Sequence, residues 1–266
     1  MKRFKSEFAH SYATYSFGYC EYAVLERGEG LHEAYDEGFL PFSGSPDIKH
    51  TLYMARSARI DLKKFVPNSE NRRILRRFDG PAQRGPSSAQ RSGKLQRNIF
   101  PFARFDIKDP LFRTFCLEYF AKRHGERVMP AERFDTILHA GFITHIVEYT
   151  DADGVIVGYV FLCDDDIMSH FWFSFYDLAY AYQSLGLWLM LDCARMAQEN
   201  KKRFFYVGTV YGEKALYKTN IDSLEFWDGE MWKDDVRLLR TLGKSDDRRI
   251  HDGISLWKEG LPRFDE

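Results

Sequence analysis

The sequence of 266 residues contains few cysteines and no long apolar run. Its four cysteines, Cys20, Cys116, Cys163 and Cys193, stand far apart, with no Cys-x-x-Cys pair and no zinc-ligand spacing. We therefore expect reduced thiols, a cytoplasmic protein, and no bound metal or other cofactor. No segment approaches the roughly eighteen apolar residues of a membrane-spanning helix. The basic start, MKRFKSEFAH, lacks the apolar stretch of a secretion signal.

Positively and negatively charged residues are nearly equal in number, but they are unevenly distributed along the chain. The net charge is −1, yet residues 56–104 contain thirteen Lys and Arg against three acids, so the rest of the chain is strongly acidic. Segregation on this scale favours a surface that meets an anionic partner, with nucleic acid the first candidate. A solvated basic loop is the alternative. Because 44% of the residues are hydrophobic, the chain can also bury a substantial core.

Periodicity and turn residues predict a series of helices and strands. In chain order they are a helix at 31–38, an exposed strand at 59–65, a helix at 71–78, a helix at 110–124, strands at 145–149, 155–163 and 169–176, a helix at 186–200, and a strand at 204–207. Asn68 or Ser69 can cap the second of these helices. The order strand–strand–strand–helix–strand resembles the GNAT type of acyltransferase core, in which a mixed sheet surrounds a central helix. We expect an α/β fold, with a smaller N-terminal α+β region.

Composition divides the chain into three segments. Residues 1–78 form an N-terminal region with the basic strand and helix, and residues 99–266 form the transferase-like core with a charged, peripheral tail from Lys233. Between them, residues 79–98 are rich in Gly, Pro, Ser and Gln. Such a segment cannot bury enough surface to offset its ordering entropy, so we expect a mobile basic loop.

Three stretches, in order, resemble the aminoacyl-tRNA–protein transferases of the arginyl and leucyl types. They are RIDLKKFVPNSENRRILRR (59–77), FWFSFYDLAYAYQSLGLWLMLDCARMA (171–197) and FFYVGTVYGEKALYKTNIDSLEFWDGEMW (204–232). The N-terminal region departs from the family pattern, because Phe17 stands where a first cysteine is expected and Tyr53–Ser57 contains none. One thiolate, Cys20, cannot hold a zinc ion or an iron–sulfur cluster. The resemblance is therefore to a divergent member that lacks the metal.

The resemblance implies a reaction in which an α-amine attacks the ester that joins an amino acid to its tRNA. Three residues become catalytic candidates: Asp177, Ser184 and Lys218. Asp177 could orient or deprotonate the amine, or it could simply cap a turn. Ser184 opens a helix whose free amides suit a phosphate or an oxyanion, although ordinary N-capping would explain it as well. The charged tRNA is a co-substrate, so the reaction needs no separate cofactor.

Further residues are candidates for binding. Tyr211, Lys214 and Tyr217 could contact the donor or the acceptor, although exposed lysines often serve only solubility. Arg56 and Arg59 could pair with an acidic residue at the acceptor's N-terminus. The tRNA acceptor stem could meet the basic side chains of the first matching stretch, where phosphates dominate affinity. These are Lys63, Lys64, Arg72, Arg73, Arg76 and Arg77.

The predicted function is transfer of an amino acid, arginine or leucine, from a charged tRNA to the N-terminal α-amine of a protein or peptide. Two alternatives remain. An N-acyltransferase that uses acyl-CoA would need a Gly-rich pyrophosphate-binding turn, of which Gln183–Gly186 supplies only a fragment. A non-catalytic tRNA-binding descendant would fit the lost cysteines but not the retained core. The amino acid, the acceptor and the oligomeric state are left open by the sequence.

Overall fold

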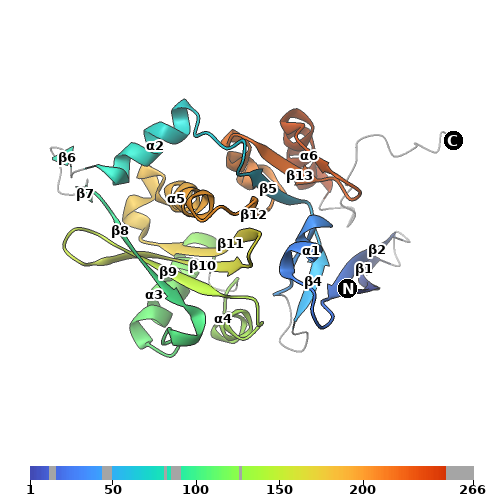
Figure 1. Cartoon of the computed structure of the whole chain (residues 1–266). Helices are drawn as coiled ribbons and strands as arrows, with labels where there is room; N and C mark the ends of the chain where they lie inside the picture. The colour runs from blue at the N-terminus through green and yellow to red at the C-terminus, as the bar shows by residue number, and fades with distance from the viewer. Residues whose placement is uncertain (12–15, 44–49, 81–82, 85–90, 126–127, 250–266) are drawn as a thin grey trace. The chain divides into compact units, whose positions relative to one another are not determined.

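The chain forms two compact units, shown in Figure 1. The computed structural model describes residues 1–11, 16–43, 50–80, 83–84, 91–125 and 128–249. The first unit takes residues 1–42, 50–66 and 206–266, and the second takes residues 43–49 and 67–205. The first unit is discontinuous in sequence because the strand at 57–61 pairs with the strand at 224–227.

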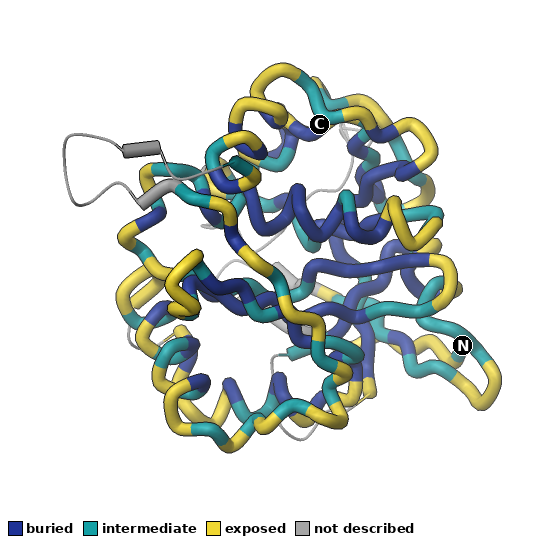
Figure 2. The backbone as a smooth tube through the Cα atoms, turned by 60° about the vertical axis from the view of Figure 1, so that its left-hand side comes forward, coloured by how far each residue is buried: buried dark blue, intermediate teal, exposed yellow. Residues whose placement is uncertain are grey.

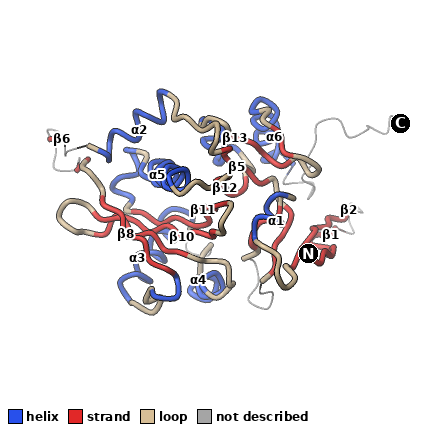
Figure 3. The backbone as a smooth tube through the Cα atoms, viewed as in Figure 1, coloured by secondary structure: helices blue, strands red, loops and turns tan. Residues whose placement is uncertain are grey.

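The second unit is a four-stranded antiparallel sheet with helices on both faces (Figures 1 and 3). Its strands, in spatial order, are β8 (Gln96–Pro101), β9 (His145–Thr150), β10 (Ile156–Asp164) and β11 (Met168–Tyr176). Helices α3 (Pro110–His124) and α4 (Ala131–Leu138) cover one face, and α2 (Ser69–Asp79) and α5 (Leu185–Glu199) lie on the other. Shorter elements are β6 (Gln83–Arg84), β7 (Arg91–Ser92), and the 3₁₀ helices η1 (Phe102–Arg104) and η2 (Leu178–Gln183).

Burial on both faces explains why β10 is apolar along almost its whole length. Tyr159 and Phe161 join the aromatic cluster under α3 and α4, and the alternate residues Val160 and Leu162 are equally inaccessible. Figure 2 shows the backbone coloured by burial, with long buried stretches and with exposed positions gathered at turns. A strand buried on both faces reads as a continuous apolar run, which is how 155–163 appears in the sequence.

The first unit contains two groups of strands. One sheet has the order β1 (Lys2–Ser11), β2 (Ser16–Val24), β4 (Thr51–Met54) and β3 (Phe39–Pro41). The other group has the order β14 (Trp232–Lys233), β13 (Leu224–Trp227), β5 (Ser57–Asp61) and β12 (Phe204–Thr209), and β12 enters this unit at Tyr206. The helices are α1 (Leu31–Asp36), the 3₁₀ helix η3 (Glu213–Asn220) and α6 (Val236–Arg249).

The mixed α/β character is confirmed, and the expected helices and strands occur within two residues of their predicted bounds, except that the strand expected at 59–65 lies at 57–61. Two expectations are wrong. The strand β5 is buried at all five positions rather than exposed, because it lies between β13 and β12. The tail is not peripheral from 236 to 249, since α6 packs on η3 and buries Leu239 and Leu242. The expected mobile loop at 79–98 lies partly outside the described residues; its last residues belong to β8.

Within the described ranges, no helix is both long and apolar enough to cross a lipid bilayer.

Candidate functional site

Helix α2 presents a row of guanidinium groups to solvent. Asn68 caps it, since its side-chain oxygen accepts a hydrogen bond of 2.9 Å from the backbone N–H of Asn71. Its apolar residues Ile74, Leu75 and Phe78 are buried. The exposed residues on the rest of the helix include three of the predicted tRNA-binding arginines, Arg72, Arg73 and Arg76. Arg73 forms a surface ion pair with Glu70 at 2.5 Å, which a phosphate could replace at small cost.

The fourth arginine, Arg77, joins α2 to the segment before α5. Its Nη1 donates a hydrogen bond of 2.8 Å to the backbone oxygen of Gln183. Beside this contact, the ring of Phe78 packs on Tyr180 and Trp188, with ring centroids 6.2 Å and 5.5 Å away. The basic helix and the start of α5 are therefore held together by one charged hydrogen bond and an aromatic cluster.

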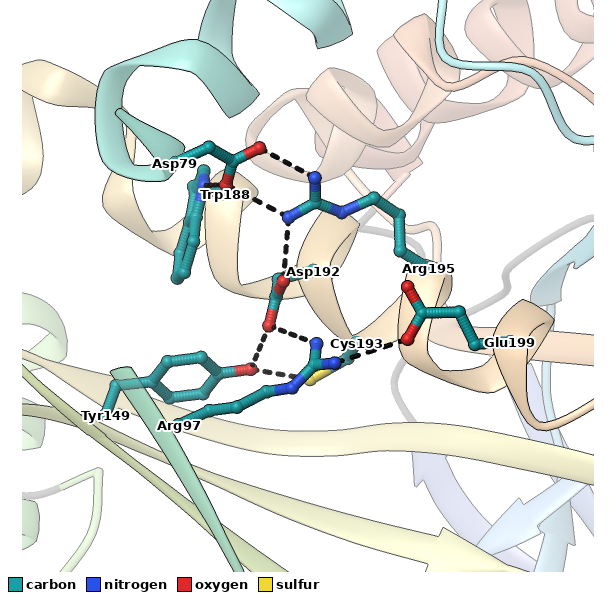
Figure 4. A network of polar contacts seen from close by, with 8 residues as sticks. All are labelled: Asp79, Arg97, Tyr149, Trp188, Asp192, Cys193, Arg195 and Glu199. Carbon is teal, nitrogen blue, oxygen red and sulfur yellow. Dashed lines mark hydrogen bonds and ion pairs between the residues drawn. The ribbon is translucent and has the colours of Figure 1, made fainter. Parts of the chain in front are cut away.

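A network of ion pairs joins Asp79, the last residue of α2, to the second half of α5, as Figure 4 shows. Asp79 accepts hydrogen bonds from both terminal nitrogens of Arg195, at 2.7 and 3.0 Å. Arg195 also bonds to the buried Asp192 at 2.8 Å, and Asp192 accepts from Arg97 of β8 at 3.0 Å. The carboxylate of Asp192 is thereby shared between two guanidinium groups. These charges line a cavity of about 370 Å³ and bond chiefly to one another, so we interpret the network as structural.

Two further titratable side chains, Tyr149 and Cys193, adjoin the network at Asp192. The hydroxyl of Tyr149 donates to Asp192 at 3.0 Å and lies 3.3 Å from the sulfur of Cys193. Burial raises the pKa of both Tyr149 and Cys193 well above their ordinary values. Both groups therefore stay protonated at neutral pH, and Cys193 is not a nucleophile.

Asp177 lies at the point where β11 ends. Its carboxylate accepts a hydrogen bond of 2.9 Å from the backbone N–H of Ala179 and caps η2. The capping alternative is thus present in the structure. Capping occupies one carboxylate oxygen, and the predicted catalytic role of Asp177 stays a prediction.

Ser184 joins η2 to α5 in an unusual backbone conformation. Its φ of +63° lies in the left-handed region, which residues other than glycine seldom adopt. The hydroxyl makes no capping hydrogen bond, so ordinary N-capping does not explain this serine. Two residues on, a Cβ at Gly186 would come within 2.7 Å of the Tyr176 ring, so a larger residue there would require that ring to move. Left-handed, non-glycine residues are more frequent at functional sites.

In the first unit, Lys218 is the candidate with the most unusual environment. It belongs to η3, and its Nζ donates a hydrogen bond of 2.9 Å to the backbone oxygen of Thr209. Burial lowers the pKa of this ammonium group to about 8. Because a neutral amine accepts protons, a lysine in this state is able to exchange a proton near physiological pH.

Arg56 is enclosed rather than presented to solvent. Its side chain is 0% exposed, and its Nη1 pairs with Asp246 of α6 at 2.7 Å. Its guanidinium carbon stands 4.7 Å from the centre of the Tyr211 ring, and the Tyr211 hydroxyl accepts from the backbone N–H of Arg56 at 2.8 Å. Both predicted binding residues are thus engaged with each other inside the protein.

Arg59 is also bonded within the protein. It forms ion pairs of 2.9 Å with Asp36 and with Glu225, and it lies 4.0 Å from the centre of the Trp232 ring. Two carboxylates and an indole hold this guanidinium in one orientation. Any contact with an acceptor would have to compete with these partners.

The remaining predicted residues are at the surface. Lys63, Lys214 and Tyr217 are exposed, and Lys64 is exposed while pairing with Asp61 at 3.4 Å. Asp246 and Trp232 were not among the predicted site residues. Their partners lie 190 and 173 positions away in sequence, and no local pattern marks such pairs.

The described residues provide no set of three metal-ligating side chains. Cys20 is half-buried and its thiol lies 3.7 Å from the backbone oxygen of Glu21, while the other three cysteines are buried. The residues in place therefore do not fit the zinc ion or iron–sulfur cluster that cysteine-bearing transferases would hold.

Comparisons with known proteins agree with the motifs. The family model described as "Arginine-tRNA-protein transferase, C terminus" matches residues 112–228. The chain is 28% identical over 173 residues to an aspartate/glutamate leucyltransferase of Thiobacillus denitrificans, covering 63% of this chain and 64% of that protein. It is 29% identical over 197 residues to the protein of the same name from Paracoccus denitrificans, covering 66% and 63%. The chain therefore spans a little under two thirds of the length of these curated relatives.

A solved structure of L-PGS from Bacillus licheniformis is a more distant match. It has a TM-score of 0.41 and 13% identity, over 68% of this chain and 51% of that chain. A likeness at this level carries no conclusion about the reaction. The ordered motifs, the family model and the leucyltransferase relatives agree with one another and support a member of the aminoacyl-tRNA–protein transferase family.

Proposed function

We propose that this chain is an aminoacyltransferase that moves an amino acid from a charged tRNA to the N-terminal α-amine of a protein or peptide. The observation that carries the proposal is the family match over residues 112–228, which includes Asp177, Ser184 and Lys218. A GNAT-like arrangement of the core is part of the same proposal. The partners are accordingly a charged tRNA and an acceptor N-terminus.

The proposed reaction requires few catalytic groups from the protein. The ester of a charged tRNA is already activated, so the enzyme has to align the two reactants, provide a neutral amine and stabilise an oxyanion. An α-amine has a pKa of about 8, so one weak base near it is sufficient. Asp177, in the second unit, is the proposed residue for proton transfer, and Lys218, in the first unit, is a separate candidate for the same role. The uncapped start of α5 at Ser184 is the proposed site for the developing negative charge.

Binding of the tRNA is proposed for the basic side chains of Lys63, Lys64 and α2. Support comes from three exposed arginines on one helix and from Arg77, which bonds that helix to the start of α5. Phosphates bound along α2 would lie in the same compact unit as Ser184. Lys214 and Tyr217 are proposed to contact the donor or the acceptor. The buried Arg56 is proposed to support Tyr211 rather than to touch the acceptor.

Leucine is the proposed donor residue, and aspartate or glutamate the proposed first residue of the acceptor. Both relatives are named aspartate/glutamate leucyltransferases, whereas the description of the family model names arginine as the transferred residue's tRNA type. The exposed Lys214 supplies positive charge that would suit an acidic first residue.

The test is transfer of labelled amino acid. The purified chain is incubated separately with leucine-charged and arginine-charged tRNA, and with peptides that begin with Asp, Glu, Lys or Arg. Label on the Asp and Glu peptides from leucine-charged tRNA is the expected result. The same peptides with an acetylated N-terminus are the matched control and should stay unlabelled. Absence of label from both tRNAs on every peptide, in the presence of folded protein, would refute the proposed activity.

A further inference from the structure

Tyr182 is an aromatic side chain that the packing of the protein leaves almost entirely in solvent. It is 97% exposed, the highest value among the large hydrophobic side chains that are exposed in the described part of the chain. Its neighbour Tyr180, two residues earlier in the same 3₁₀ helix, is buried. The exposure of Tyr182 is therefore specific to its position and is not shared by the whole segment.

The backbone that carries Tyr182 is held at both ends. Asp177 caps the first turn of η2, and Arg77 donates to the backbone oxygen of Gln183, the residue directly after Tyr182. Between these points Tyr180 packs against Phe78 of α2. A ring on a fixed backbone loses little conformational freedom when a ligand packs on it.

One cation is held close to the backbone of Tyr182. The hydrogen bond at Gln183 brings the fourth arginine of α2 next to it, and the other three arginines of that helix are exposed. Positive charge that follows a backbone, combined with an exposed aromatic ring, is the combination that binds single-stranded nucleic acid, since every base has a face on which a ring stacks. An acidic peptide would use the charge but not the ring.

We propose that Tyr182 is a stacking platform for an unpaired base at the 3′ end of the tRNA, and that the arginines of α2 bind the adjoining phosphates. This inference rests on the proposed function, because it supplies a position for the end of the tRNA that bears the amino acid. Tyr182 is a binding residue in this scheme and takes no part in proton transfer.

The experiment measures the affinity of the full chain for two forms of one uncharged leucine tRNA, intact and trimmed of its unpaired 3′ nucleotides. Loss of one base–aromatic contact weakens binding by at least about fivefold. We expect Tyr182→Ala to bind the intact tRNA at least about fivefold more weakly than the native chain, and to bind the trimmed tRNA equally well. Tyr182→Trp, which retains an aromatic ring, should bind the intact tRNA with the affinity of the native chain. Tyr19→Ala, at another exposed tyrosine, is the matched control and should resemble the native chain.

A fluorescent adenine analogue at the 3′ end of the intact tRNA gives a second measurement. Stacking on Tyr182 should quench it on binding, and Tyr182→Ala should restore its emission. Equal binding of intact tRNA by native and Tyr182→Ala chains would refute the platform, as would an equal loss for both tRNA forms. Native protein that binds neither form would refute the proposed function itself, so the two failures are distinguishable.

Discussion

The guanidinium of Arg77 donates a hydrogen bond of 2.8 Å to the backbone oxygen of Gln183, which lies 106 positions later in the chain. This contact ties the helix proposed to bind tRNA phosphates to the residue before Ser184, where the negative charge of the reaction is proposed to develop. Replacing Arg77 should therefore weaken the attachment of α2 to this segment, in addition to removing one positive charge from the surface.

Arg77→Met is expected to lower the free energy of unfolding by about 1 kcal/mol, since a charged hydrogen bond to a backbone oxygen is lost. Arg76→Met, one position away and exposed, should change it by less than about 0.5 kcal/mol. Urea unfolding of the two variants makes the comparison. Equal stabilities would mean that the hydrogen bond does not hold α2 in solution.

The exposed arginines of α2 should determine how tRNA binding responds to salt. Each phosphate contact that is removed is expected to reduce the slope of log affinity against log salt by about one. The triple variant Arg72→Gln, Arg73→Gln, Arg76→Gln should therefore bind tRNA more weakly and with a shallower slope. Binding measured at several salt concentrations tests this. A slope unchanged from that of the native chain would place the tRNA elsewhere on the protein.

The capping role of Asp177 can be tested separately from the role of its negative charge. Asn retains an oxygen that accepts from the N–H of Ala179, so Asp177→Asn should keep the stability of the native chain and lose turnover more than tRNA affinity. Asp177→Ala should in addition lower the free energy of unfolding by about 1 kcal/mol. Single-turnover transfer and urea unfolding distinguish these effects. Native turnover in Asp177→Asn would remove the carboxylate from the mechanism.

Lys218 should make stability depend on pH in a known direction. Its pKa falls from 10.5 in its ordinary state to about 8 in the folded chain. Between these two values the unfolded chain binds more protons at this residue, so its contribution to the free energy of unfolding increases with pH and is least favourable below about pH 8. Lys218→Met removes that penalty and should stabilise the chain by roughly 1–3 kcal/mol at neutral pH.

The gain from Lys218→Met should shrink as the pH approaches about 9.5, where the native lysine is largely neutral. Urea unfolding of both proteins at the two pH values measures it. Lys214→Met, at an exposed lysine of the same 3₁₀ helix, is the control and should show no such dependence. A gain that is constant with pH would contradict a lowered pKa at Lys218.

Asp192 should be the most sensitive position in the charge network. Asp192→Asn leaves Arg97 and Arg195 without their shared carboxylate and is expected to cost about 3 kcal/mol of unfolding free energy. Glu199→Gln, which affects an exposed partner of Arg97, should cost less than about 1 kcal/mol. Thermal or urea unfolding of the two variants measures this difference in stability. Similar losses for both would show that burial does not strengthen the contacts of Asp192.

Elements with strong local signals were predictable from the sequence. The helix at 110–124 was expected at its observed bounds, because Pro110 begins it, Gly125 follows it and its apolar residues recur with helical spacing. Helix α2 was predictable for the same reason, whereas its cap was left open between Asn68 and Ser69, and the structure shows Asn68. The exposed arginines also follow from pattern, since they lie opposite the apolar residues Ile74, Leu75 and Phe78.

Contacts between distant segments were not predictable. The basic stretch at 56–61 has the composition of a surface strand, yet Arg56 is buried because Asp246 pairs with it from 190 positions away. Arg59 is likewise accommodated by Asp36 and Glu225. Charged residues rarely become buried without such partners, and a single sequence does not show which acid will supply the pairing.

The first unit is assembled from both ends of the chain, and this has a consequence for synthesis on the ribosome. Residues 67–205 can complete their sheet and helices as soon as they emerge, whereas β5 has to wait for β13, and Arg56 for Asp246. The strands β1 to β4 pair among themselves, but β5 lacks its partner β13 for most of translation. The nascent chain therefore exposes apolar residues of β5, Ala58 and Ile60, that the finished protein buries.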